Sequence, residues 1–147
     1  MKFLTKKDAV KWCRENQIHL DERELPFLTK SSKDFNIPSD AGQRVALVTS
    51  QFEHFRDEDE ILIWITAWGV WPSSERLHIF DRLRLSYGEK RLLNEISAHV
   101  VSKNEYEDGL SILILAVLFL WDCYVLSKSG KFIFYSHDEC GWNTNKV

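Results

Sequence analysis

Apolar residues recur at helical spacing in several stretches of the chain. The first follows Thr5, and Asp8 stands three residues later, which is the spacing of a capping box, so a helix is predicted from there to about Asn16. A second helix is predicted after a cap at Ser39 or Asp40. Its apolar positions, alternately four and three residues apart, are Ala41, Val45, Val48, Phe52 and Phe55.

Two further helices are predicted in the second half of the chain. Ser73 or Ser74 is a suitable cap for the third helix, and Gly88 is placed to end it. A fourth helix is predicted from Asn104 to about Trp121, because an acidic start leads into a long apolar run. The third helix is expected to bury Ile79, Phe80, Leu83 and Tyr87.

Three segments have the composition of buried strands. Residues 61–66 are β-branched, aromatic and apolar on both faces, which predicts a central strand covered on both sides. Residues 123–126 and 132–135 form a hairpin around a loop that contains Gly130.

The remaining strand assignments rest on weaker patterns. Residues 99–101 are expected to form a short strand, residues 25–28 an edge strand that tolerates Pro26, and residues 31–34 a loop. Alternating helices and hairpins without repeats or linkers predict one α+β domain over residues 1–147. We expect a mostly antiparallel sheet with about four helices packed on it.

Composition narrows the possible functions. The 147 residues include 19 Lys and Arg against 22 Asp and Glu, and this net charge of −3 makes nucleic-acid binding improbable. The apolar run from Ile112 to Trp121 is too short to span a membrane. Three cysteines without C-x-x-C spacing indicate reduced thiols and a cytoplasmic protein.

The segment Trp-Gly-Val-Trp-Pro-Ser-Ser-Glu at 68–75 is the first candidate site. It joins a central strand to a helix, a place where loops often carry binding groups. Alternatively, its aromatic rings close one end of the core. The candidate binding residues here and on the following helix are Trp68, Trp71, Ser73, Glu75 and Arg82.

Two further motifs contain histidine. Glu75 and His78 share a helix face with the spacing of half a di-iron site, but the chain has no second such pair, so a polar surface is favoured. The segment Ser-His-Asp-Glu at 136–139 ends the last predicted strand. A catalytic or metal-binding role would use His137, Asp138 and Glu139 together with His99 or His78.

The motif at 136–139 supplies too few ligands for a metal by itself. We therefore predict that His137 binds no metal and that the protein uses no cofactor. Polar residues at a strand end usually bond to nearby backbone, so Asp138 is expected to accept hydrogen bonds from backbone or from a basic side chain.

The motifs at 68–75 and 136–139, with Ser86-Tyr87-Gly88 and Trp121-Asp122 between them, resemble a family of uncharacterised bacterial proteins. The resemblance spans roughly residues 60–139 and implies a bacterial, intracellular protein. That family has no established activity, so it assigns no catalytic residue to this chain.

Two functions from different classes remain open. The absence of a complete catalytic set and the six tryptophans favour a non-enzymatic protein-binding module, such as an immunity-like or antitoxin-like partner of a bacterial toxin. The alternative is a metal-assisted hydrolase or nuclease built on the residues near 136–139.

Overall fold

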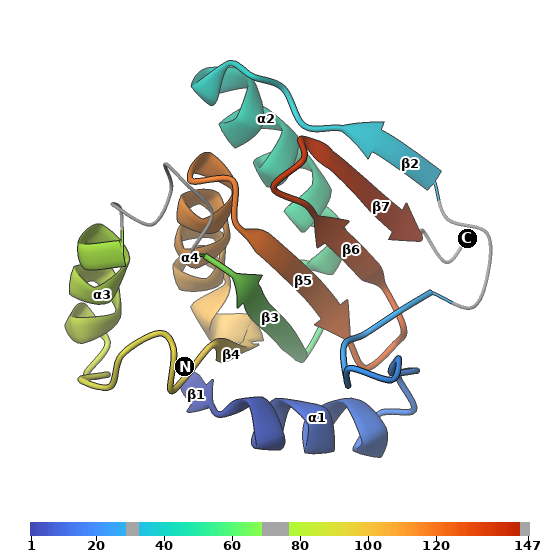
Figure 1. Cartoon of the computed structure of the whole chain (residues 1–147), viewed down its shortest axis with the longest axis vertical. Coiled ribbons are helices and arrows are strands. Elements are labelled where there is room, and N and C mark those ends of the chain that lie inside the picture. The colour runs from blue at the N-terminus through green and yellow to red at the C-terminus, as the bar shows by residue number, and fades with distance from the viewer. Residues whose placement is uncertain (29–32, 69–76, 145–147) are drawn as a thin grey trace.

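The computed structural model describes residues 1–28, 33–68 and 77–144. These residues form four α-helices and a seven-stranded sheet in which all neighbouring strands are antiparallel, so the predicted α+β fold is confirmed (Figure 1). The helices are α1 (Lys6–Glu15), α2 (Ala41–Phe52), α3 (Leu77–Ser86) and α4 (Tyr106–Leu118). The strands are β1 (Lys2–Leu4), β2 (Lys33–Asn36), β3 (Glu60–Ala67), β4 (Ala98–Ser102), β5 (Asp122–Ser127), β6 (Phe132–Tyr135) and β7 (Cys140–Thr144).

The sheet has the strand order β1-β4-β3-β5-β6-β7-β2. The predicted strand at 61–66 is confirmed as an interior strand, because β3 pairs with both β4 and β5. The predicted hairpin is also confirmed, with Cys123 opposite Tyr135 and Leu126 opposite Phe132. Gly130 has a φ of 87° in its loop, a conformation that glycine adopts without steric cost.

Alternate residues of the central strands enter two separate cores. On one face α2, α3 and α4 pack on Ile61, Ile63 and Ile65 of β3. On the other face α1 and residues 18–28 pack on Leu62 and Trp64. In Figure 1, α1 runs along the lower end of the sheet and does not extend to its upper end, so this second layer is the smaller one.

Several predicted helix ends agree with the structure, but α4 spans Tyr106–Leu118 and so ends before the predicted boundary near Trp121. The Thr5 side chain accepts a hydrogen bond from the backbone of Asp8, and Asp40 caps α2 in the same way through Gln43. Gly88 follows α3 with a φ of 86°. The proposed caps of α3, Ser73 and Ser74, lie outside the described residues.

The predictions for the edges of the sheet were wrong. Residues 25–28 form no strand and contribute only one bridge, between Leu20 and Pro26. The predicted loop at 31–34 instead overlaps β2, which pairs with β7 at the sheet edge. β1, β2 and β7 are short or carry polar residues, and their pairing partners rather than their own patterns hold them extended.

The buried stripe predicted for α3 was also partly wrong. Phe80 is buried as expected, but Ile79 is 39% exposed and Arg84 is 0% exposed. Arg84 turns inward because its Nη2 donates to the carbonyl oxygen of Ile96 at 2.7 Å. The ring centroids of Phe3 and Phe80 lie 5.7 and 6.0 Å from the guanidinium carbon of Arg84.

Candidate functional site

The motif at 136–139 forms the turn between β6 and β7. Asp122, the first residue of β5, lies beside it: one carboxylate oxygen accepts from the His137 backbone nitrogen and from His137 Nδ1, both at 2.7 Å. The hydrogen bond that His137 donates to the Asp122 carboxylate holds the pKa of His137 above its usual value of 6.5. Asp122 therefore fixes the orientation of the His137 ring, and the His137 side chain remains partly open to solvent.

Asp138 continues this arrangement on the outside of the turn. Its Oδ1 lies 3.3 Å from His137 Nε2, so carboxylates approach both nitrogens of the imidazole. The Asp138 backbone donates to the Ser136 hydroxyl at 3.2 Å. We expected Asp138 to accept a hydrogen bond from backbone, but in this turn Asp122 accepts one, from the His137 backbone nitrogen. The Asp138 carboxylate instead contacts the basic side chain next to it, the His137 imidazole.

Glu139 has a role in holding the turn against the helices. Its φ is 57°, and its carboxylate pairs with Arg44 Nη2 at 3.1 Å. Arg44 also donates to the carbonyl oxygens of Pro38 and Leu118, at 2.6 and 3.2 Å. These bonds link α2, the end of α4 and the turn, which is a structural use of the Glu139 side chain.

The two other candidate histidines occupy different surroundings. His99 is 0% exposed in β4, between the rings of Phe3 and Phe80, and its Nδ1 lies 3.3 Å from the Ile63 carbonyl oxygen. Burial, followed by the nearby Arg84 charge, lowers the pKa of His99 to about 3. His78 lies on the exposed side of α3.

The structure does not bring these side chains together as a metal site. Within residues 1–28, 33–68 and 77–144, no group of three or more His, Cys, Asp or Glu could hold a metal ion. The ligand set that the hydrolase alternative needs, with His137, Asp138 and Glu139 joined by His99 or His78, is therefore not assembled there.

The candidate residues at 68–75 are only partly described. Trp71, Ser73 and Glu75 lie outside the described residues. Trp68 is half-buried and packs against the larger core, and Arg82 is exposed on α3. β3 leads into this segment, and its Ala67 pairs with Asp122, so the two motifs are attached to the same end of the sheet.

The side chains that sequence reasoning missed lie on the strands next to this turn. Tyr124, Phe134 and Trp142 stand opposite one another on β5, β6 and β7 and form what we call the aromatic row. The ring centroids of Tyr124 and Phe134 are 4.5 Å apart, and Phe134 stacks on Trp142 at 5.1 Å with an interplanar angle of 15°.

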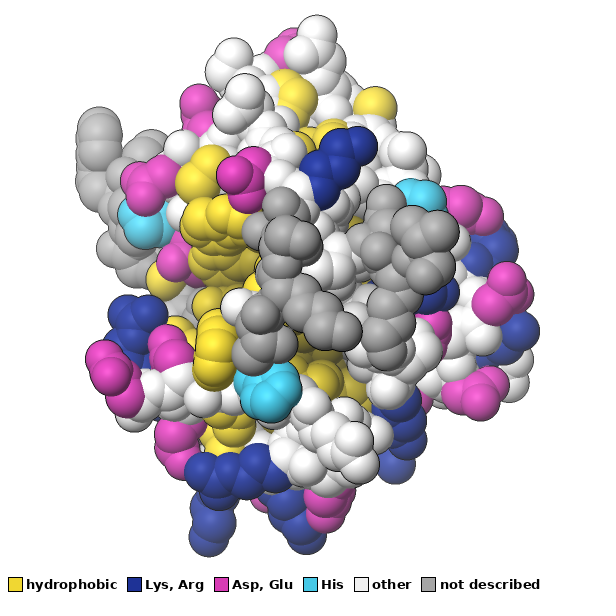
Figure 2. Space-filling model, turned by 90° about the vertical axis from the view of Figure 1, so that its right-hand side faces the viewer, with side chains coloured by type: hydrophobic (Ala, Val, Ile, Leu, Met, Phe, Trp, Pro, Cys, Tyr) yellow, Lys and Arg dark blue, Asp and Glu magenta, His cyan; other side chains and the backbone are white. Residues whose placement is uncertain are grey.

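The aromatic row becomes more open toward the edge of the sheet. Tyr124 is buried and Phe134 half-buried, whereas Trp142 is 36% exposed. Figure 2 views the side of the molecule with β2 and β7, where hydrophobic side chains gather in a strip left of centre, bordered by acidic and histidine side chains and, toward its lower end, by Lys and Arg. The alternation of aromatic residues in the predicted hairpin was the available signal, but β7 was not predicted.

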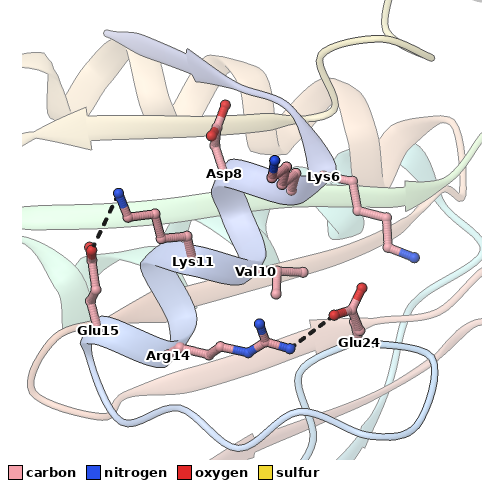
Figure 3. A pocket seen from close by; sticks show the side chains of 8 residues that line it. Lys6, Asp8, Val10, Lys11, Arg14, Glu15 and Glu24 are labelled. Atoms are coloured by element: carbon pink, nitrogen blue, oxygen red, sulfur yellow. Dashed lines mark hydrogen bonds and ion pairs between the residues drawn. The ribbon is translucent and has the colours of Figure 1, made fainter.

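A cleft with a volume of about 710 Å³ lies away from this turn, between α1 and residues near Glu24 (Figure 3). Charged side chains of both signs dominate its walls, and four of them form ion pairs. Lys11 pairs with Glu15 at 3.8 Å and Arg14 with Glu24 at 2.9 Å. This cleft therefore offers a mixed-charge surface rather than a field of one sign.

No known protein family, curated protein or solved structure matches the chain. The resemblance to an uncharacterised bacterial family stays a prediction. Within the described part of the chain, every helix is too short or too polar to cross a bilayer.

Proposed function

We propose that this protein binds another protein through the aromatic row and the acidic residues beside it. The supporting observation is Trp142, which is 36% exposed yet held flat against Phe134. A rigid aromatic side chain that is partly open to solvent loses little conformational entropy on binding. Tryptophan is also enriched among the residues that dominate interface energies.

The charges around the aromatic row favour a basic partner. Asp34 lies directly opposite Trp142 in the β2–β7 pairing, so both side chains project from the same face of the sheet. Asp138 is exposed in the adjoining turn, and the whole chain carries a net charge of −3. A protein that presents an apolar side chain among Lys and Arg residues would complement this surface.

The proposal includes the immunity-like or antitoxin-like function, since a small acidic protein that covers a basic toxin needs such a surface and no catalytic set. In this proposal the turn at 136–139 has a structural role. Asp122 orients His137, and Glu139 fixes the turn to α2, so Asp138 is presented in a set geometry beside the aromatic row.

Quantitative affinity capture from the native host, followed by reconstitution with the purified partner, tests the proposal. Trp142→Ala is expected to weaken the reconstituted complex by about 30-fold or more, the effect of removing an interface hot spot. Asp34→Lys is expected to slow association and to reduce its dependence on salt concentration.

Leu92→Ala is the matched control, because Leu92 is also an exposed apolar residue but follows α3. It should bind the partner like the unmodified protein. Thermal unfolding of both alanine variants separates lost binding from lost folding. The proposal fails if every recovered protein binds Trp142→Ala and Leu92→Ala equally well.

A further inference from the structure

A second, smaller cleft on the α1 face of the sheet adjoins the mixed-charge cleft of Figure 3, and Lys6 lines both. Its volume is about 330 Å³, at the lower end of the range for small-molecule sites. It is lined by four segments: the start of α1, residues near Leu25, the end of β3 and the segment before β4. The lining residues are Lys6, Arg23, Leu25, Trp64, Ile65, Thr66, Trp68, Asn94 and Ser97.

The charges of this cleft all have one sign. Lys6 and Arg23 line it, and none of its lining residues is acidic. Arg23 is neutralised by Asp21 at 3.3 Å. Lys6 Nζ donates only to the Arg23 carbonyl oxygen, at 3.2 Å, and among the described residues no carboxylate lies within ion-pair distance of it. In Figure 3 both dashed ion pairs join other side chains of α1 to carboxylates, and none reaches Lys6.

A serine hydroxyl also lines the cleft. Ser97 is 7% exposed, and its carbonyl oxygen is fixed by the backbone nitrogen of Ile65 at 3.0 Å. Its side chain has no hydrogen-bond partner within the described parts of the chain. A ligand oxygen in the cleft would give this hydroxyl a hydrogen-bond partner in place of water.

The opposite walls are apolar. Trp64 is almost fully buried, Trp68 is half-buried, and Leu25 packs against the smaller core. Indole rings beside a cation and a hydroxyl match a flat apolar molecule that carries one negative charge.

We propose that this cleft binds a small organic anion, a carboxylate on a planar apolar body. The carboxylate would pair with Lys6 and accept from the Ser97 hydroxyl, and the apolar body would pack against Trp64 and Trp68. This activity is additional to partner binding and uses none of the residues of the aromatic row.

Titration of the ¹⁵N-labelled protein with 2-naphthoate, followed by NMR, tests the proposal. We expect saturable shifts of Thr66, Ser97 and the Trp64 indole with a dissociation constant below about 1 mM. The neutral amide, 2-naphthamide, has nearly the same shape but cannot pair with an ammonium. It is expected to bind about tenfold or more weakly, which corresponds to about 1.4 kcal/mol.

Lys6→Gln should remove the preference for the carboxylate, whereas Lys7→Gln should keep it. Lys7 is a matched control because it is the next residue of α1 and lines only the mixed-charge cleft. Equal binding of acid and amide, equal effects of the two substitutions, or no shift at about 5 mM naphthoate would overturn the proposal. Trp142→Ala should leave naphthoate binding intact, so the two proposals can fail separately.

Discussion

At the scale of single residues, the protein holds two histidines in opposite electrostatic states. His99 is shut between aromatic rings with a pKa of about 3, so it stays neutral throughout the physiological range. His137 lies against the carboxylate of Asp122, which raises its pKa. Burial without a counter-charge lowers the pKa of an imidazole, and a neighbouring carboxylate raises it.

This contrast predicts the outcome of an NMR titration of the imidazole protons. His137 should titrate above 6.5 in the unmodified protein and return toward 6.5 in Asp122→Asn, which keeps an acceptor oxygen but removes the charge. His99 serves as the internal control, since its ring should show no titration between pH 8 and about pH 4.

The same substitution has a consequence for stability. Because the folded pKa of His137 is raised, its pairing with Asp122 stabilises the fold fully below the unfolded pKa and is lost as pH rises through the folded pKa. The stability difference between the unmodified protein and Asp122→Asn should therefore shrink from pH 6 to pH 8. The pH-dependent part should stay below about 1 kcal/mol, because the imidazole is partly exposed and solvent screens the pair. A difference that grows with pH would contradict the assignment.

At the scale of elements, the long apolar segments were predictable and the sheet edges were not. β3, β5 and α4 each contain a run of consecutive apolar residues, so burial favours their places in the core. β2 reads Lys-Asp-Phe-Asn, and no local pattern in it favours a strand; it is extended because β7 offers backbone partners. The inward turn of Arg84 was equally unpredictable, since it depends on a carbonyl oxygen of Ile96 that only the folded chain brings near.

The Asp122–His137 contact was not predicted, although the sequence held enough information to predict it. The predicted hairpin pairs Cys123 with Tyr135, and continuing that register by one residue places Asp122 beside Ser136 and His137. The contact could therefore have been derived from the sequence. The aromatic row could be derived only in part, because Trp142 joins it through β7.

Gly141 provides a test of how the edge strands are held. A Cβ atom at this position would lie 2.6 Å from the Phe134 carbonyl oxygen and closer still to the Phe35 ring. Gly141→Ala is therefore expected to push β2 away from β7 and to cost about 1–3 kcal/mol. Hydrogen exchange should show lost protection in β2 while the amides of β3 remain protected.

Gly88→Ala is the control for that experiment. Gly88 has a φ of 86°, and a Cβ atom added there would meet nothing within 4 Å, so alanine costs about 1 kcal/mol of backbone strain without any clash. Protection of β2 should not change in this variant. Equal loss of β2 protection in both variants would mean that the edge responds to overall stability rather than to the close approach of Phe35.

At the scale of the whole molecule, two cores share one set of strands. Ile63 and Val125 face α2 and α4, while Trp64 and Tyr124, their neighbours along the same strands, lie in the core under α1. Removing either layer would expose one face of β3 and β5 to water. The two faces are therefore expected to unfold together, although α1 forms a small layer by itself.

The cysteines allow that expectation to be measured. Cys13 of α1 is buried in the smaller core and Cys123 of β5 in the larger one, and burial raises the pKa of both thiols. Cys140, at the start of β7, is partly exposed. In the native protein a thiol reagent should modify Cys140 rapidly and the two buried thiols only through unfolding.

The decisive experiment follows the two buried thiols in Cys140→Ser at increasing urea concentration, with mass spectrometry assigning each modified site. If the molecule unfolds as one unit, Cys13 and Cys123 should give the same opening free energy and the same dependence on urea. Earlier modification of Cys13 would show that α1 opens while the sheet stays folded. That outcome matters for function, because Lys6 at the start of α1 could then close the proposed anion cleft only while the helix is docked.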